Sequence, residues 1–257
     1  MREEAAIVLD EGKEYLAESR LGPLARREGI GSIHELVRRL QADRDGELQR
    51  KVIEAMTTNE TSFFRDKHPF DVFKSVLLPE IVAHARERQL DIWCAAASTG
   101  QEPYSVAMLL RETPELADWT IRLIATDISE EVLERGRRGR FTQLEVNRGL
   151  PAALLVKYFT RSGIDWQIGD DLRRMVEFRQ LNLAGPWPSF RKMDVVFMRN
   201  VLIYFDVATK REILGRARAV LKPDGSLFLG GAETTLNLDD GYERVQLDKA
   251  GLYRVRR

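Results

Sequence analysis

Residues 90–105 read LDIWCAAASTGQEPYS, and this stretch decides the fold class. The short apolar run at 90–96 is typical of a buried strand, and small residues up to Gly100 follow it at once. A helical stretch begins near Pro103, a residue type that suits the first turn of a helix. The stretch therefore predicts a strand, a tight loop and a helix. Because the loop lacks the GxGxxG spacing of a pyrophosphate site, it either approaches another ligand closely or only permits tight packing.

Strands and helices alternate after this unit. The expected segments are a strand at 121–126 that ends at Asp127, a helix from Ser129, a strand at 193–198, a helix at 207–221, a turn at 222–225 and a strand at 226–230. Such alternation predicts a parallel sheet with right-handed crossovers, which binds ligands at the carboxyl ends of its strands. The predicted fold class is therefore α/β, of the Rossmann-like kind.

Two segments depart from this alternation. Residues 157–180 contain short apolar runs separated by Gly-containing turns, which predicts a small antiparallel excursion inserted into the main fold. Residues 242–247 and 251–255 predict a terminal antiparallel pair in the same way.

The chain before residue 67 shows no strand-like run and predicts a small helical domain. Two helices are expected after residue 67, a connecting one around 70–78 that leads to Pro79 and another up to Arg88. Within the helical domain the expected helices cover 28–41 and 48–56. In the first of these, apolar residues that include Val37 recur at three- and four-residue spacings, and Ser32 followed by Glu35 offers a capping box. Gly22-Pro23 predicts a turn between helices.

Composition argues against several classes of protein. The 257 residues hold 40 Lys and Arg against 40 Asp and Glu, so bulk electrostatics does not favour binding to nucleic acid or an acidic membrane. The single cysteine, Cys94, predicts no intrachain disulfide and a reducing compartment. The three histidines are scattered without ligand spacing, so no metal site is expected. The acidic start and the lack of a long apolar run predict a soluble, cytoplasmic protein.

Two carboxylates stand where such a sheet binds its ligand. Asp127 ends the second strand, where α/β nucleotide sites place an acidic residue that accepts hydrogen bonds from ribose hydroxyls. The alternative role for Asp127 is the N-cap of the following helix. Glu102 falls in the first helical turn after Gly100, where it either contacts a ligand or only complements the helix dipole.

Four motifs in the chain resemble those of one protein family. They read TNETSFFRD at 58–66, AASTGQEPYS at 96–105, ATDIS at 125–129 and FMRNVLIYFD at 197–206. In their order and approximate spacing they are similar to the CheR family, the S-adenosylmethionine-dependent methyltransferases of chemotaxis receptors. The resemblance covers nearly the whole chain, although the helical segment looks one helix short at its amino end.

The resemblance implies an all-helical domain over 1–66 and a class I methyltransferase domain over 67–257, with a three-stranded antiparallel subdomain at about 157–180. The implied cofactor is S-adenosylmethionine, with S-adenosylhomocysteine as its product. Carried over by position, the implied cofactor-binding residues are Asn59, Thr61, Arg65, Glu102, Asp127, Asn182, Leu183, Arg199 and Asn200. The residues implied at the methyl-transfer centre are Arg65 and Tyr204.

The substrate implied by the resemblance is a glutamate side chain on the cytoplasmic helices of a chemoreceptor, methylated to a γ-glutamyl ester for sensory adaptation. A carboxylate is already ionised at neutral pH, so it needs alignment with the methyl carbon and removal of water rather than a general base. Arginine and tyrosine suit that task, since both donate hydrogen bonds that orient a carboxylate.

The helical domain carries candidate docking residues for such a partner. In the CheR family, positive residues of this domain face acidic receptor helices. The corresponding candidates here are Arg20, Arg26, Arg27, Arg38 and Arg39. Only Glu28 and Glu35 oppose them within residues 20–39, so this segment is locally basic in a chain without net charge.

Two other functions stay open at this point. A non-catalytic adaptor would bind the cofactor or its product as a signal, although the presence of Arg65 and Tyr204 favours an enzyme. A nucleic-acid methyltransferase would need an Asn/Asp-Pro-Pro-aromatic motif and a basic groove, and the sequence offers neither. We expect a monomer, since nothing in the sequence demands a larger assembly. We also expect no binding of a receptor tail peptide, because the turn at 162–165 is brief.

Overall fold

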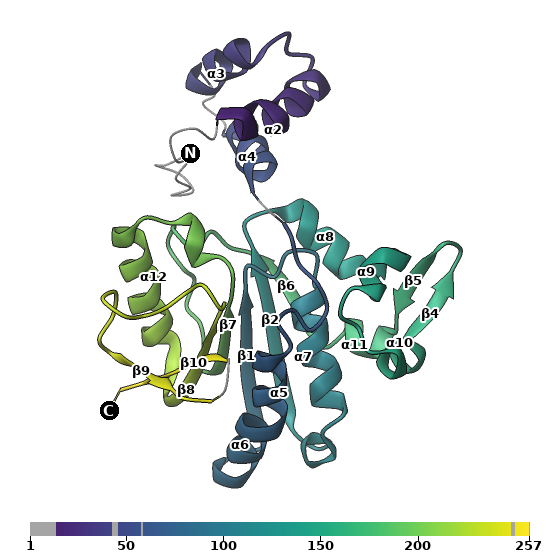
Figure 1. Ribbon diagram of the computed structural model, residues 1–257, viewed down its shortest axis with the longest axis vertical. Helices are drawn as coiled ribbons and strands as arrows, with labels where there is room; N and C mark the ends of the chain where they lie inside the picture. The colour runs from purple at the N-terminus through teal and green to yellow at the C-terminus, as the bar shows by residue number, and fades with distance from the viewer. Residues whose placement is uncertain (1–13, 43–45, 58, 248–249, 257) are drawn as a thin grey trace.

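The computed structural model describes residues 14–42, 46–57, 59–247 and 250–256. Its first helices are α2 (Glu14–Arg27), α3 (Ile33–Ala42) and α4 (Glu47–Met56). They share a separate apolar core made by Leu21, Leu24, Ala25, Ile30, Leu36, Val52 and Met56. Figure 1 shows these helices grouped above the sheet, to which the chain leads after α4. The expectation of a helix missing at the amino end falls outside the described residues.

The turn predicted at Gly22-Pro23 is wrong, because both residues lie inside α2. The turn that ends α2 contains Gly29 instead, and its φ of 65° is a conformation that glycine adopts without strain. There the N–H of Gly29 donates to the carbonyl of Arg26, and the N–H of Ile30 to that of Ala25. These two bonds are the usual way in which a left-handed residue ends a helix.

The helix predicted over 28–41 begins only at Ile33, because the turn at the end of α2 occupies the residues before it. Half of the predicted capping box is present, since Ser32 Oγ accepts the N–H of Glu35 at 3.2 Å. Val37, which the periodicity placed on the inner face, is 44% exposed.

Residues 59–66 differ from the helices predicted for 1–66. They form no helix, and Phe63 is fully buried with its ring centroid 5.0 Å from that of Phe141 in the sheet domain. The N–H of Phe64 donates to Ser105 Oγ at 2.9 Å. Because these aromatic and polar contacts belong to the sheet domain, the packing divides the chain after Met56 rather than at residue 66.

One continuous helix, rather than the two predicted on either side of Pro79, leads to the sheet. It consists of α5 (His68–Val72), the π-helical turn η1 (Phe73–Leu77) and α6 (Leu78–His84). Within it the N–H of Leu78 donates to the carbonyl of Phe73, which is a π-type bond. Because proline lacks an N–H, the hydrogen-bond ladder is interrupted at Pro79 in any case, and the wider turn before it keeps the helix continuous.

The main sheet has seven strands in the order β6-β2-β1-β7-β8-β10-β9. The strands are β1 (Gln89–Ala95), β2 (Thr120–Asp127), β6 (Val176–Gln180), β7 (Met193–Met198), β8 (Leu221–Leu229), β9 (Tyr242–Val245) and β10 (Gly251–Val255). The first five in the order run parallel, whereas β10 is antiparallel to both of its neighbours. The predicted strands and the terminal antiparallel pair are therefore confirmed, and residues 222–225 loop out of the β7–β8 pairing where a turn was predicted.

Helices cover both faces of this sheet. They include α7 (Gln101–Arg111), η2 (Pro114–Leu116) and α8 (Glu130–Arg138), and later η3 (Leu202–Tyr204) and α12 (Val207–Val220). Along β1 the side chains alternate between two cores: Ile92 and Cys94 belong to one, and Trp93 and Ala95 to the other. The continuous apolar run at 90–96 is thus the signature of a strand buried on both faces. No helix among the described residues is both long and apolar enough to span a membrane.

Cys94 lies in this buried strand and gives a direct probe of the fold. Full burial raises the pKa of its thiol well above the usual value, so the reactive thiolate is disfavoured. We expect a thiol reagent to label the native protein at least about 10³-fold more slowly than the urea-unfolded chain, since only opened molecules expose the thiol. Labelling of the native chain at the unfolded rate would contradict the position of β1.

A second, three-stranded antiparallel sheet projects from the main one, at the right of Figure 1. It has the order β3-β5-β4, with β3 (Arg140–Phe141), β4 (Phe159–Ser162) and β5 (Asp165–Ile168). The short helices α9 (Gln143–Asn147), α10 (Ala152–Tyr158) and α11 (Asp170–Arg173) surround it.

The predicted range of about 157–180 for this inserted sheet is wrong at both ends. One strand, β3, comes earlier in the chain, and residues 176–180 form β6, which pairs in parallel with β2 at the edge of the main sheet. An edge strand buried on one face alternates in polarity, as Val176 and Phe178 do with their neighbours, so it resembles an antiparallel strand in sequence.

Candidate active site

A cleft opens at the carboxyl ends of β1, β2, β6 and β7. The strands β2 and β7 flank β1 on opposite sides, so the strand order reverses at this point. Open α/β sheets bind their ligands at such a reversal. All ten residues that the resemblance implied for the site line it: Asn59, Thr61, Arg65, Glu102, Asp127, Asn182, Leu183, Arg199, Asn200 and Tyr204. The five candidate docking arginines do not.

The loop after β1 follows an unusual backbone path into this cleft. Ala96 and Ser98 have φ angles of 58° and 50°, and Gly100 has 96°. Non-glycine residues in this region carry strain and occur most often at functional sites. The loop is held by Ser98, whose Oγ donates to Asn59 O at 2.8 Å and so ties the segment after α4 to the floor of the cleft. The tight-loop prediction for residues 96–100 is confirmed in its geometry.

Asp127 is 7% exposed and holds both neighbouring loops together. Its Oδ2 accepts the N–H of Ser98 at 2.9 Å, and its Oδ1 accepts that of Ser129 at 3.1 Å. It is not the N-cap of α8, because Ser129 occupies that position and accepts the N–H of Val132. A carboxylate has room for about four hydrogen bonds, so Asp127 keeps acceptor capacity for a ligand. Burial raises its pKa, and the backbone N–H donors oppose that rise.

Arg199 and Glu102 form a buried ion pair at the centre of the site. The side chain of Arg199 is 1% exposed and donates from Nη1 to Glu102 Oε2 at 2.9 Å. Its Nη2 donates to Asp66 Oδ2 at 2.7 Å and to the Arg65 carbonyl at 2.8 Å. The ring of Phe70 lies below the guanidinium, 5.5 Å away. Burial raises the pKa of Glu102, and the attraction of Arg199 reduces that rise.

In this network Arg199 contacts other parts of the protein, whereas a residue that only bound a ligand would leave its donors free for that ligand. Its donors hold Glu102 and the backbone around Arg65, and within the described residues its Nε has no partner. Glu102 therefore does more than complement the dipole of its helix, because it forms a buried ion pair with Arg199 from a distant part of the chain.

Arg65 and Tyr204 reach the cleft from elements that lie far apart in the sequence. Arg65 donates from Nη1 to Glu60 O at 2.8 Å, which leaves further donors of its guanidinium available. Tyr204 ends η3 and is partly exposed, and no described residue hydrogen-bonds its hydroxyl. Both side chains can therefore donate to a ligand that enters the cleft.

Further residues line the cleft that sequence reasoning did not single out. They are Met56, Thr57, Glu60, Ala96, Ser98, Ile128, Leu181, Val201 and Phe205. Several of these adjoin predicted residues, so their proximity in the chain was the available signal. Met56 is different, because it comes from the end of α4 in the helical domain, and no sequence pattern indicates that this helix end meets the sheet.

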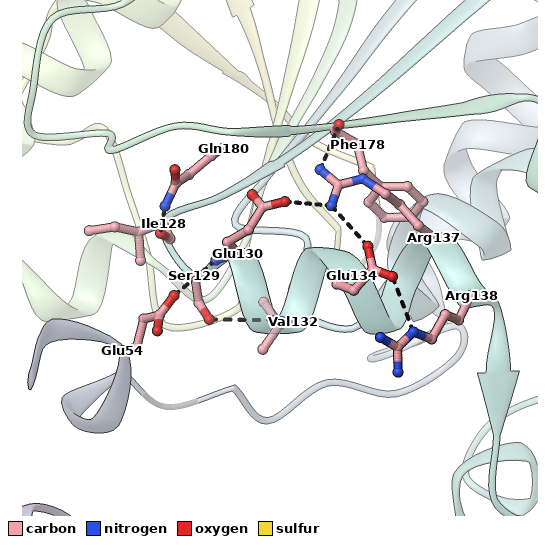
Figure 2. Close-up of polar contacts among 10 residues, drawn as sticks. All are labelled: Glu54, Ile128, Ser129, Glu130, Val132, Glu134, Arg137, Arg138, Phe178 and Gln180. Carbon is pink, nitrogen blue, oxygen red and sulfur yellow. Dashed lines mark hydrogen bonds and ion pairs between the residues drawn. The ribbon is translucent and has the colours of Figure 1, made fainter. Parts of the chain in front are cut away.

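Figure 2 shows how the helical domain meets α8 beside the cleft. Glu54 of α4 accepts the N–H of Glu130 in the first turn of α8 at 3.1 Å, and Gln180 donates to the carbonyl of Ile128 at 2.9 Å. At the other end of α8, Arg137 and Arg138 pair with acidic residues of the same helix. These arginines thus lie at a solvated helix end, where basic residues also complement the helix dipole.

The five candidate docking arginines differ in their contacts and exposure. Arg20 donates to the carbonyl of Met56 at 2.6 Å and so joins α2 to the end of α4. Arg38 and Arg39 both pair with Glu35 on α3. Arg26 and Arg27 are exposed in the last turn of α2.

The cleft fits S-adenosylmethionine by the chemistry of its residues. Asp127 offers acceptors for ribose hydroxyls, and Glu102 offers a negative charge for a cationic ligand. Apolar side chains for an adenine ring are supplied by Ile128, Leu181 and Leu183. The strand order, the switch-point cleft and this set of residues define a class I S-adenosylmethionine-dependent methyltransferase.

The chain belongs to the CheR methyltransferase family. Residues 59–250 match the family's S-adenosylmethionine-binding domain, and residues 1–57 match its all-alpha domain. The chain is 43% identical to chemotaxis protein methyltransferase 1 of Pseudomonas aeruginosa, over 97% of this chain and 93% of that protein. It is 38% identical to a chemotaxis protein methyltransferase of Vibrio parahaemolyticus, over 100% of this chain and 94% of that protein.

Among solved structures, TrmN from Thermus thermophilus is similar over 72% of this chain and 48% of that one. Its TM-score is 0.44 and its sequence identity 16%.

Proposed function

We propose that this chain methylates glutamate side chains on the cytoplasmic helices of a chemoreceptor, forming γ-glutamyl methyl esters that serve sensory adaptation. One observation carries the proposal: Arg65 and Tyr204, two donors suited to a carboxylate, line the same cleft as Glu102 and Asp127. The relatives from Pseudomonas aeruginosa and Vibrio parahaemolyticus, both chemotaxis protein methyltransferases, support the link to chemotaxis.

The residues of the site divide the work of such a reaction. Bound S-adenosylmethionine supplies a methyl group on a positively charged sulfur. Asp127 would bind the ribose hydroxyls, and Glu102, kept ionised by Arg199, would attract the cationic part of the cofactor. Asn59, Thr61, Asn182, Leu183 and Asn200 would complete the binding surface.

The acceptor needs orientation more than activation. Arg65 and Tyr204 would donate hydrogen bonds to the glutamate carboxylate and hold one oxygen in line with the methyl carbon. Arg65 already donates one hydrogen bond to Glu60 O, so its ion pair with the acceptor carboxylate would be weaker. A weaker ion pair is an advantage here, because a tight one would lower the nucleophilicity of the carboxylate.

Docking of the receptor would fall to the helical domain. Arg26 and Arg27 are exposed and suit an acidic helical surface. Arg38 and Arg39 are partly compensated by Glu35, and Arg20 supports the fold. The absence of a tail-peptide site stays a prediction; the β4–β5 connection is the two-residue turn Gly163-Ile164.

Replacement of Asp127 by alanine is expected to weaken binding of S-adenosylhomocysteine by about 1–3 kcal/mol, because hydrogen bonds to a charged acceptor are lost. Isothermal titration calorimetry of the purified variant measures this change. Asp165→Ala is the matched control, since Asp165 pairs with Arg140 in the small sheet and does not line the cleft. An unchanged affinity in the Asp127 variant would remove this residue from the ribose site.

The proposal is tested by mass spectrometry of a receptor cytoplasmic fragment after incubation with the protein and S-adenosylmethionine. We expect glutamate-containing peptides to gain the mass of one CH₂ group, and the gain to vanish when those glutamates are replaced by glutamine. Methylation of other residue types would contradict the proposed acceptor. Cofactor binding without any methylation would favour the adaptor.

A further inference from the structure

A single buried carboxylate, that of Glu233, gathers four backbone N–H groups at the edge of the active site. Its Oε1 accepts those of Val201 and Leu202, at 2.9 and 2.7 Å. Its Oε2 accepts those of Asn200 and Gly230, both at 2.7 Å. We call this arrangement the Glu233 clasp. Glu233 is 8% exposed, so its charge is balanced almost entirely by these oriented donors.

The clasp joins the ends of two neighbouring parallel strands. Asn200 to Leu202 follow β7, and Gly230 follows β8. The first of these segments carries the cleft residues Asn200 and Val201 and leads directly into η3, which ends at Tyr204. The three N–H groups of this segment would otherwise lack partners at the end of a strand, so Glu233 fixes the path of the chain from the sheet to Tyr204.

The backbone turns sharply at the end of β7. Asn200 has a φ of 59°, in the left-handed region, which asparagine adopts more readily than most residues with a side chain. The turn also needs glycine at residue 230, because a Cβ there would lie 2.7 Å from Asn200 Nδ2 and 2.8 Å from Glu233 Oε2. The clasp holds this turn through the N–H groups of Asn200, Val201 and Leu202.

We propose that Glu233 is a positioning residue for methyl transfer, which acts by holding the segment from Asn200 to Tyr204 so that the Tyr204 hydroxyl faces the acceptor. This inference rests on the proposed role of Tyr204 in glutamate methylation. Glu233 itself does not line the cleft, so its effect reaches the reaction only through the segment that it holds.

The variant Glu233→Gln tests the clasp with almost no change in volume. Each oxygen of Glu233 accepts two N–H groups, so an amide nitrogen in either orientation would point its own hydrogens at two donors. We expect kcat for methylation of the receptor fragment to fall by roughly 10²-fold, the effect of a displacement of about 1 Å at a reacting group. The Kd of S-adenosylhomocysteine should rise by a smaller factor, because only Asn200 of the segment held by Glu233 belongs to the proposed cofactor surface.

A double-mutant cycle with Tyr204→Phe separates positioning from a general loss of stability. If Glu233 acts through the Tyr204 hydroxyl, adding Glu233→Gln to Tyr204→Phe should lower kcat little further. Multiplicative losses, or an unchanged kcat in the single variant, would overturn the inference. Because the unmodified protein is assayed in parallel, failure of the proposed function itself would appear separately, as no methylation by wild type.

Asp194→Asn is the matched control. Asp194 also accepts a backbone N–H, that of Asp91 at 2.8 Å, but at the opposite end of β7. This variant should lower the melting temperature and leave kcat unchanged. If Glu233→Gln does not yield folded protein, Glu233→Asp, which keeps the charge and shortens its reach, enters the same cycle and is judged by the same criterion.

Discussion

Replacement of Arg199 by methionine is expected to lower the free energy of unfolding by about 3–5 kcal/mol, the usual cost of removing one partner of a buried ion pair. Methionine fills similar space, so the loss is mainly electrostatic. The variant leaves Glu102 buried without a cation, and it frees the Arg65 carbonyl and Asp66 from their donor. Urea denaturation followed by circular dichroism measures the change.

The dependence of this loss on pH identifies its source. Burial already raises the pKa of Glu102, and removal of Arg199 takes away the interaction that limits that rise. A carboxyl whose folded-state pKa exceeds its unfolded pKa favours folding at low pH and loses that contribution as pH rises through the folded-state pKa. The deficit of Arg199→Met should therefore be largest near neutral pH and shrink toward about pH 5.

Two further variants make the test specific. Adding Glu102→Gln to Arg199→Met should recover much of the lost stability, because the unpaired charge is then gone. Arg38→Met is the control for loss of a surface cation, since Arg38 is 78% exposed, and it should leave stability unchanged. A deficit that is equal at all pH values, or that the double variant does not reduce, would contradict the pairing of Arg199 with Glu102.

The second large effect concerns catalysis. Tyr204→Phe is expected to reduce kcat for methylation of the receptor fragment by about 10²-fold, the scale of one lost donor to a reacting oxygen. Affinity for S-adenosylhomocysteine should stay nearly unchanged, because the hydroxyl is assigned to the acceptor rather than to the cofactor. Steady-state kinetics with a labelled methyl group, together with calorimetry, measures both quantities.

A second tyrosine provides the control for this variant. The hydroxyl of Tyr242 donates to the carbonyl of Leu214 at 3.0 Å in the core beside α12, away from the cleft. Tyr242→Phe should lower stability and leave kcat intact. Full activity of Tyr204→Phe would show that its hydroxyl does not align the acceptor.

The sequence predicted those elements of the fold whose burial produces a recognisable local pattern. The strand at 90–96 is buried on both faces and so is apolar throughout, and Asp127 follows a similar strand. The four motifs contain eight of the ten candidate residues that line the cleft, and Asn182 and Leu183, outside the motifs, line it as well. Several of these residues follow the end of a strand that is recognisable from sequence, whereas Asn59, Thr61 and Arg65 lie between α4 and α5 and were found through the first motif alone.

The failures have tertiary causes. Gly22-Pro23 has the composition of a turn but lies in α2, whose apolar residues pack on α4. The edge strand β6 alternates like an antiparallel strand, and only its pairing with β2 shows its direction. Glu233 follows β8 in sequence without any motif, and its four donors come together only when β7 and β8 lie side by side.

The most direct test of the account uses transfer of a labelled methyl group from S-adenosylmethionine to receptor-bearing membranes, followed by brief treatment with alkali. We predict that the label leaves the membranes as volatile methanol, because γ-glutamyl methyl esters hydrolyse in base. Label that resists alkali would mean that the acceptor is not a carboxylate. No transfer at all, from protein that binds S-adenosylhomocysteine, would contradict catalysis and leave the adaptor as the function.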